Sequence, residues 1–194
     1  MPTQEIVYND VTLIILAGGE GRRLQGQDKG LAIYNGKPLI EYALATFSNN
    51  VAHVLISANR NIKFYEEYGH PVITDQYSSY QGPLAGIASC LTKLQTEYAF
   101  IIACDMPLIP NDLLPRLYHA KPAKVVLPHD GLRTQPLCCL LHHSILPSIE
   151  HCLSEKKNKV IHCFENESPT IVDCSDMKQS FININSANEL NKKL

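Results

Sequence analysis

Short apolar runs alternate with segments of helical periodicity along most of the chain. Residues 13–16, 51–56 and 98–103 are rich in β-branched and other apolar residues, which is typical of strands. The last of these runs is apolar on both faces, as expected of a central parallel strand. Between the runs, apolar side chains recur at helical spacing, most clearly in 39–47 after Pro38. This alternation indicates βαβ units and therefore an α/β fold.

The same pattern continues into the second half of the chain. We expect further helices at 62–68, 84–94, 111–120, 145–153 and 186–193. Further extended segments are expected at 71–74, 125–128, 135–141, 170–173 and 181–184, of which 135–141 is predicted to be antiparallel. The polar tract 154–159 is typical of a surface turn and not of a linker between domains. We therefore expect a single domain over residues 1–194.

Composition and charge restrict the class of protein. The chain has 194 residues, of which 45% are apolar, and this is enough for one proper core. A formal net charge of −2 provides no global basic field, so nucleic acid is not an expected partner. The first ten residues are polar and acidic, unlike a signal peptide, and no apolar run approaches the ~18 residues of a membrane span. We expect a cytoplasmic protein with no membrane association.

Cysteine and histidine usage does not suggest a metal site. The seven cysteines are scattered without a C-x-x-C pair, which is typical of reduced, partly buried thiols. The eight histidines also lack ligand spacing. His142 and His143 are adjacent and therefore point in different directions, which favours a surface or structural role.

A glycine-rich, cationic segment follows the first predicted strand. Glycines let backbone N–H groups approach phosphate oxygens, and Arg22, Arg23 and Lys29 supply positive charge. The segment therefore predicts a polyphosphate site, although a solvated polar turn is the alternative. It is not a P-loop, because Lys29 is followed by Gly30, and its glycines do not have the spacing of the dinucleotide fingerprint.

Asp105 is the second candidate, because it follows the buried strand 98–103, at the edge where open α/β sheets bind ligands. A carboxylate there can supply one of the oxygen ligands of Mg²⁺, with water and phosphate oxygens completing the octahedron. The alternative is a turn residue that binds local amides. Gly86, inside a predicted helix, indicates close approach by a ligand or another backbone, or simple tight packing.

The chain resembles the molybdenum cofactor guanylyltransferases (MobA family), within the wider group of GT-A-like nucleotidyltransferases. The start Leu-Ala-Gly-Gly is shared with sugar-phosphate and cytidylyl nucleotidyltransferases, whereas Asp-Lys-Gly-Leu, Gly-Pro-Leu-Ala-Gly and Asn-x-Asn are more specific. The matching segments span nearly the whole chain in family order: 16–19, 22–23, 28–31, 35–39, 58–60, 75, 82–86, 104–107, 129–131 and 181–185. The resemblance implies a three-layer α/β/α, Rossmann-like fold with a mostly parallel sheet.

The resemblance also implies an activity and a set of site residues. The expected reaction is transfer of GMP from GTP to the terminal phosphate of molybdopterin, with Mg²⁺, giving molybdopterin guanine dinucleotide and pyrophosphate. Lys29, Asp105 and Arg23 are the expected catalytic residues, and Asp105 is the expected metal ligand. The expected GTP-binding residues are Leu16, Ala17, Gly18, Lys29, Ser57, Asp75 and Asp105.

Two asparagines are implied on the pterin side of the site. Asn183 and Asn185 would share one face of the last predicted strand. Ser57 departs from the family pattern, which commonly has asparagine there, although its hydroxyl still donates and accepts hydrogen bonds.

The implied chemistry agrees with the residues. Because the nucleophile is already a phosphate anion, the enzyme needs alignment and charge neutralisation more than a strong base. The alternatives are cytidylyl transfer to molybdopterin, nucleotidyl transfer to a sugar phosphate, and a non-catalytic nucleotide-binding assembly protein. We expect a monomer whose protein partners are molybdenum-insertion proteins or molybdoenzyme chaperones.

Overall fold

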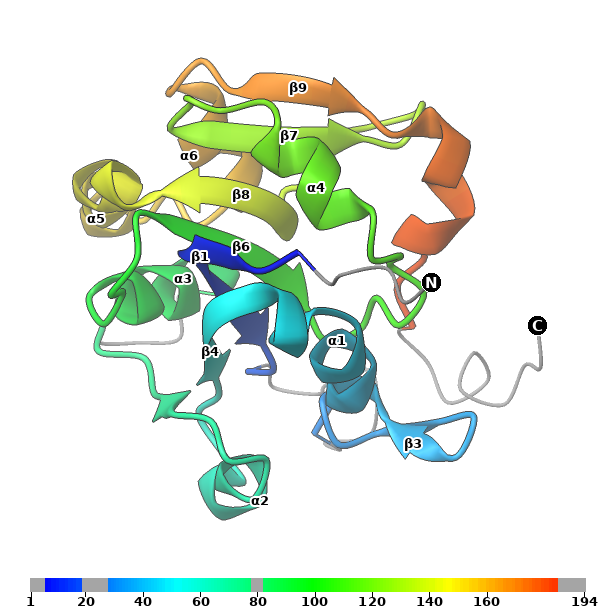
Figure 1. The fold of residues 1–194 in the computed structure, drawn as a ribbon. Coiled ribbons are helices and arrows are strands. Elements are labelled where there is room, and N and C mark those ends of the chain that lie inside the picture. Colours follow the sequence, from blue (N-terminus) through cyan, green and yellow to red (C-terminus); the bar gives the residue numbers. More distant parts are fainter. Residues whose placement is uncertain (1–5, 19–27, 78–81, 185–194) are drawn as a thin grey trace.

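A mixed seven-stranded sheet forms the centre of the protein (Figure 1). The computed structural model describes residues 6–18, 28–77 and 82–184. The strand order is β5-β4-β1-β6-β8-β7-β9. The strands are β1 (Tyr8–Leu16), β4 (Val51–Ser57), β5 (Val72–Ile73), β6 (Tyr98–Ala103), β7 (Val125–His129), β8 (Cys138–His142) and β9 (Thr170–Asp173).

Parallel pairing dominates this sheet. Strand β1 pairs in parallel with β4 and β6, and β4–β5 and β7–β9 are also parallel pairs. Strand β8 is antiparallel to both of its neighbours, as the sequence predicts for this segment. The other six strands of the sheet therefore share one direction, and their carboxyl ends lie at one edge.

Helices cover both faces of the sheet, so the predicted three-layer α/β/α architecture is confirmed (Figure 1). On β1, Leu13 and Ile15 belong to the core beneath α1 and α4, whereas Ile14 belongs to the opposite core beneath α3, α5 and α6. The helices are α1 (Leu39–Phe47), α2 (Ile62–Glu66), α3 (Pro83–Leu91), α4 (Leu113–Tyr118), α5 (Leu146–Ser154) and α6 (Val160–Glu165), with 3₁₀ turns η2 (Ser48–Asn50), η3 (His143–Ile145) and η4 (Ser175–Phe181).

Three details differ from the sequence prediction. A hairpin of β2 (Ile33–Tyr34) and β3 (Lys37–Pro38) was not predicted, although Asn35 and Gly36, both at positive φ, form its turn. Helix α6 was also missed. The strand expected at 181–184 is wrong: η4 occupies its start, and the Ile184 amide donates to the carbonyl oxygen of Asp105 instead of to a strand. The helix expected at 186–193 lies outside the described residues.

The seven cysteines are buried and free of disulfide bonds, which confirms that part of the prediction. Burial raises the pKa of the Cys90 thiol to about 12, and it raises the pKa of Cys139 as well. Within the described ranges, no helix has the length and apolar character that crossing a membrane requires.

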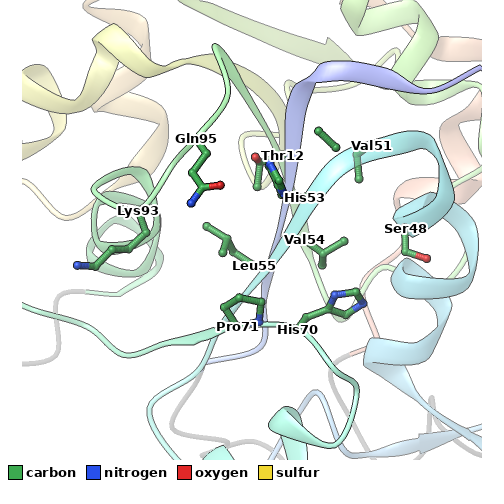
Figure 2. A pocket seen from close by; sticks show the side chains of 11 residues that line it. Thr12, Ser48, Val51, His53, Val54, Leu55, His70, Pro71, Lys93 and Gln95 are labelled. Atoms are coloured by element: carbon green, nitrogen blue, oxygen red, sulfur yellow. The ribbon is translucent and has the colours of Figure 1, made fainter.

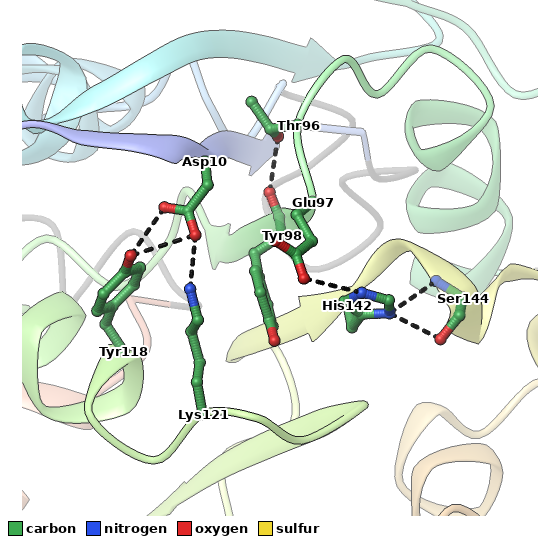
Figure 3. A network of polar contacts seen from close by, with 8 residues as sticks. All are labelled: Asp10, Thr96, Glu97, Tyr98, Tyr118, Lys121, His142 and Ser144. Atoms are coloured by element: carbon green, nitrogen blue, oxygen red, sulfur yellow. Dashed lines mark hydrogen bonds and ion pairs between the residues drawn. The ribbon is translucent and has the colours of Figure 1, made fainter.

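A polar network ties the beginning of β1 to α4 (Figure 3). Asp10 accepts hydrogen bonds from Lys121 Nζ at 2.5 Å and from the Tyr118 hydroxyl at 3.0 Å. The Lys121 ammonium also lies over the ring of Tyr98, 4.2 Å from its centroid. Burial opposes the charged form of Asp10, but the hydrogen bonds from Lys121 and Tyr118 outweigh it and hold the pKa of this carboxyl below its usual range.

This network predicts a pH-dependent contribution to stability. Since the pKa of Asp10 is lower in the folded chain, its contribution is present above the unfolded pKa of about 4 and is lost as the pH falls through the folded pKa. We expect Asp10→Asn to lower the free energy of unfolding by about 1 kcal/mol at pH 7. Urea unfolding at pH 7 and pH 3 measures this, and a deficit of equal size at both pH values contradicts it.

Candidate active site

The carboxyl ends of β1, β4 and β6 bring the first group of predicted residues together. The amides of Ala17 and Gly18 both donate to the carbonyl oxygen of Ser57, at 2.9 and 2.8 Å. On the other side, the Cys104 amide donates to the carbonyl oxygen of Leu16 at 3.1 Å. The glycine-rich segment therefore begins between β4 and β6. Arg23, predicted in this segment, lies outside the described residues.

A small pocket opens beside this junction. It is lined by Leu16, Gly18, Ser57, Asn59, Asp75, Gly82, Pro83 and Gly86. A Cβ atom on Gly86 would lie 2.5 Å from Ser57 Oγ and 3.4 Å from Asp75 Oδ1. Tight packing by two polar side chains therefore requires this glycine, and the same residue lines the pocket. The tight-packing interpretation of Gly86 is therefore confirmed, and the approach of a ligand at this position stays a prediction.

Asn59 orients the Asp75 side chain. Its Nδ2 donates to Asp75 Oδ2 at 2.8 Å, and its Oδ1 accepts from the Asp75 amide, also at 2.8 Å. Asn59 is not among the site residues predicted from the sequence, although its segment carries part of the family resemblance. The paired hydrogen bonds hold the carboxylate of Asp75, an acceptor, at the pocket.

A second cluster forms around Asp105, which follows β6. Lys29 Nζ pairs with Asp105 Oδ2, and Asn183 Nδ2 donates to the same oxygen at 3.2 Å. The structure therefore brings together Lys29, Asp105 and Asn183, as expected. Asn183 is held here by the loop after η4 and not by a strand, which corrects the predicted setting of this residue. Asn185 lies outside the described residues.

The free oxygen of Asp105 suits a hard cation. Asp105 is only 6% exposed, and its Oδ1 is buried without a hydrogen-bond partner in the part of the chain that the structure describes. Among those same residues, no three His, Cys, Asp or Glu side chains form a metal-binding group. A cation on Asp105 would therefore need oxygen ligands from phosphate and water, which is the way Mg²⁺ is usually held beside nucleotides.

The neighbouring thiol does not offer a nucleophile. Cys104 precedes Asp105, but burial raises the pKa of this thiol, with the charge of Asp105 acting in the same direction. A neutral thiol is a poor nucleophile. The cluster of Lys29 and Asp105 is thus suited to binding an anionic substrate and neutralising its charge, and not to forming a covalent intermediate at Cys104.

Another hollow lies away from this edge, along β4 (Figure 2). Its volume is about 280 Å³, and it contains His53, His70 and Lys93 among its lining side chains. None of the candidate site residues lines it. Strand β5 pairs only with Ile56 and Ser57, and the hollow lies along the residues of β4 that precede them. This hollow is therefore separate from the candidate active site.

Solved structures share this fold. Molybdopterin-guanine dinucleotide biosynthesis protein A from Archaeoglobus fulgidus superposes with a TM-score of 0.78 over 92% of this chain and 94% of that one, at 22% identity. The 2-C-methyl-D-erythritol 4-phosphate cytidylyltransferase from Thermus thermophilus gives a TM-score of 0.69 over 91% and 94% of the two chains, at 12% identity. At these identities the likeness shows the fold alone.

Sequence comparison is more specific. The chain is 39% identical to the molybdenum cofactor guanylyltransferase of Aliivibrio fischeri strain MJ11, over 91% of this chain and 92% of the relative. It is 37% identical to the protein of the same name from Vibrio cholerae, over 94% and 90%. The MobA-like NTP transferase domain matches residues 13–167. Since this match covers most of the chain, and the relatives align over about nine-tenths of it, the chain belongs to the MobA-like NTP transferase family.

Proposed function

We propose that this nucleotidyltransferase transfers GMP from GTP to the terminal phosphate of molybdopterin, giving molybdopterin guanine dinucleotide and pyrophosphate. The observation that carries the proposal is the convergence of Lys29, Asp105 and Asn183 beside the Ser57–Asp75 pocket. The names of the relatives support guanylyl transfer in particular.

The pocket is the proposed nucleotide site. Leu16, Ala17, Gly18 and Ser57 bind the nucleoside along the ends of β1 and β4, where Gly18 lines the pocket and has no side chain to block close approach. Asp75, held by Asn59, accepts hydrogen bonds from the N1–H and exocyclic amine of guanine. A carboxylate suits guanine because both of these groups are donors.

The Asp105 cluster is the proposed reaction centre. A terminal phosphate oxygen of molybdopterin attacks the α-phosphorus of GTP, and the bond to the bridging oxygen of the β-phosphate breaks, so that pyrophosphate leaves with the electron pair. Lys29 and Arg23 neutralise the phosphate charge, while Asn183 and Asn185 hold the pterin side. Mg²⁺, bound through Asp105, would add charge stabilisation at the phosphates.

The remaining proposals concern the whole protein. We infer that residues 1–194 act as one domain and as a monomer in the cytoplasm. The buried, free cysteines are compatible with a reducing compartment. The product would then pass to molybdenum-insertion proteins or to chaperones of molybdoenzymes.

Substitution of Asp105 tests the proposed role of its charge. Asp105→Asn keeps the side-chain shape but removes the charge that faces Lys29, so we expect kcat to fall by about 100-fold or more. Pyrophosphate release with GTP, Mg²⁺ and molybdopterin measures kcat. Asp112→Asn, which alters an exposed partner of Arg116, is the matched control and is expected to retain activity. Thermal unfolding checks that both variants fold, and wild-type turnover by Asp105→Asn would mean that the charge has no role.

Nucleotide analogues and substitution of Asp75 test the choice of base. Inosine triphosphate lacks the exocyclic amine of GTP, so the wild type should prefer GTP by about tenfold or more in kcat/KM, as expected when the Asp75 carboxylate loses one of its two donors. Asp75→Asn should reduce this preference to nearly one. The assay compares transfer from GTP, ITP and CTP to molybdopterin. Efficient transfer of CMP and none of GMP by the wild type would contradict guanylyl transfer itself.

A further inference from the structure

Asp28 is a buried carboxylate for which the proposed chemistry has no use. It is 6% exposed, and it accepts hydrogen bonds from the Tyr65 hydroxyl at 2.5 Å, the Gly30 amide at 3.1 Å and Asn61 Nδ2 at 2.9 Å. Arg60 Nε lies 3.5 Å from Asp28 Oδ2. A buried charge is tolerated when it is paired in this way, and these partners fix its position.

Tyr65 brings α2 against the segment that carries Lys29. Its side chain is fully buried, and burial together with the hydrogen bond to Asp28 raises the pKa of its hydroxyl, which therefore stays a donor. The contact requires a glycine, because a Cβ atom on Gly30 would lie 2.4 Å from the Tyr65 hydroxyl oxygen. Any larger residue at position 30 would push the two segments apart.

Lys29 lies between the two anchored positions. On one side of it the Asp28 carboxylate is held, and on the other the Gly30 amide is bound to that same carboxylate. The carbonyl oxygen of Lys29 also accepts from the Ala32 amide at 3.2 Å. The lysine side chain is flexible, but its backbone is already fixed here. Less conformational entropy therefore remains to be lost when the Lys29 ammonium binds Asp105 or a phosphate.

We propose that Asp28 and Tyr65 are positioning residues, which set the Lys29 ammonium at the reaction centre through the backbone of 28–30. This inference rests on the proposed function for its activity readout. A purely structural role, in which Tyr65 only attaches α2 to the sheet, is the competing explanation. The two differ in whether the effect of Tyr65 depends on Lys29.

The chain offers a closely matched pair of variants. Tyr65→Phe removes the hydroxyl that binds Asp28, and Tyr68→Phe removes a hydroxyl that donates to Glu41 Oε1 at 3.2 Å, just beyond the same helix. We expect Tyr65→Phe to lower kcat for GMP transfer by about 10- to 100-fold with little change in the KM for GTP, because misplacement acts mainly on the reacting geometry. Tyr68→Phe should leave kcat within about twofold of the wild type, a difference of under 0.5 kcal/mol.

A double-mutant cycle decides between the two roles. If Tyr65 acts through Lys29, Tyr65→Phe should change the residual rate of a Lys29→Met variant by less than about twofold. An equal loss in both backgrounds would overturn the proposal. If Tyr65→Phe fails to fold, Asn61→Gly removes another donor to Asp28, and the positive φ of Asn61 suits glycine. The same non-additivity with Lys29→Met is then expected.

A measurement without turnover separates this inference from the proposed function. Hydrogen exchange of the Gly30 amide should accelerate in Tyr65→Phe and not in Tyr68→Phe, while exchange in β1 and β6 stays unchanged. Unchanged exchange at Gly30 would overturn the anchoring role. If the wild type transfers no GMP, the proposed function fails, but the exchange experiment still tests the anchor.

Discussion

The parallel register of β1 between β4 and β6 is the constraint on which the candidate site depends. Leu16 lies opposite Ser57 on one side and Ala103 on the other, so all three strands end at nearly the same level. The chain must turn there three times, and each turn delivers a polar or glycine-rich segment to the same edge. A shift of one residue in either pairing would turn alternate side chains to the opposite face and separate these segments.

The two parts of the site are built differently. Near Ser57 the segments are joined by backbone hydrogen bonds and the glycines of the pocket leave space, whereas side-chain charges dominate near Asp105. The ion pair of Lys29 with Asp105 joins segments 76 residues apart in sequence, and Asn183 adds a third segment to the same oxygen. The low exposure of Asp105 strengthens these interactions relative to those on the surface.

Local sequence patterns predicted the helices and strands better than the side-chain contacts between segments that are distant in sequence. The bounds of α1 and β6 follow from helical spacing and from a continuous apolar run, and Asp105 was selected because it follows such a run. The pairing of Asn59 with Asp75 and the anchoring of Asp28 by Tyr65 join separate segments, and neither periodicity nor composition records such contacts. The error at 181–184 has the same origin: an alternation of apolar and polar residues resembles a strand, but Ile184 is bound by the Asp105 loop.

The burial of all seven cysteines has a consequence for handling the protein. Thiols inside a packed core are shielded from oxidants and react slowly with them, so the native chain should tolerate air. Cys138 and Cys139 emerge together when β8 detaches, and their thiolates then become available for cross-linking between chains. Unfolding in the absence of a reductant would thus become irreversible through chemistry, even where the folding equilibrium itself is reversible.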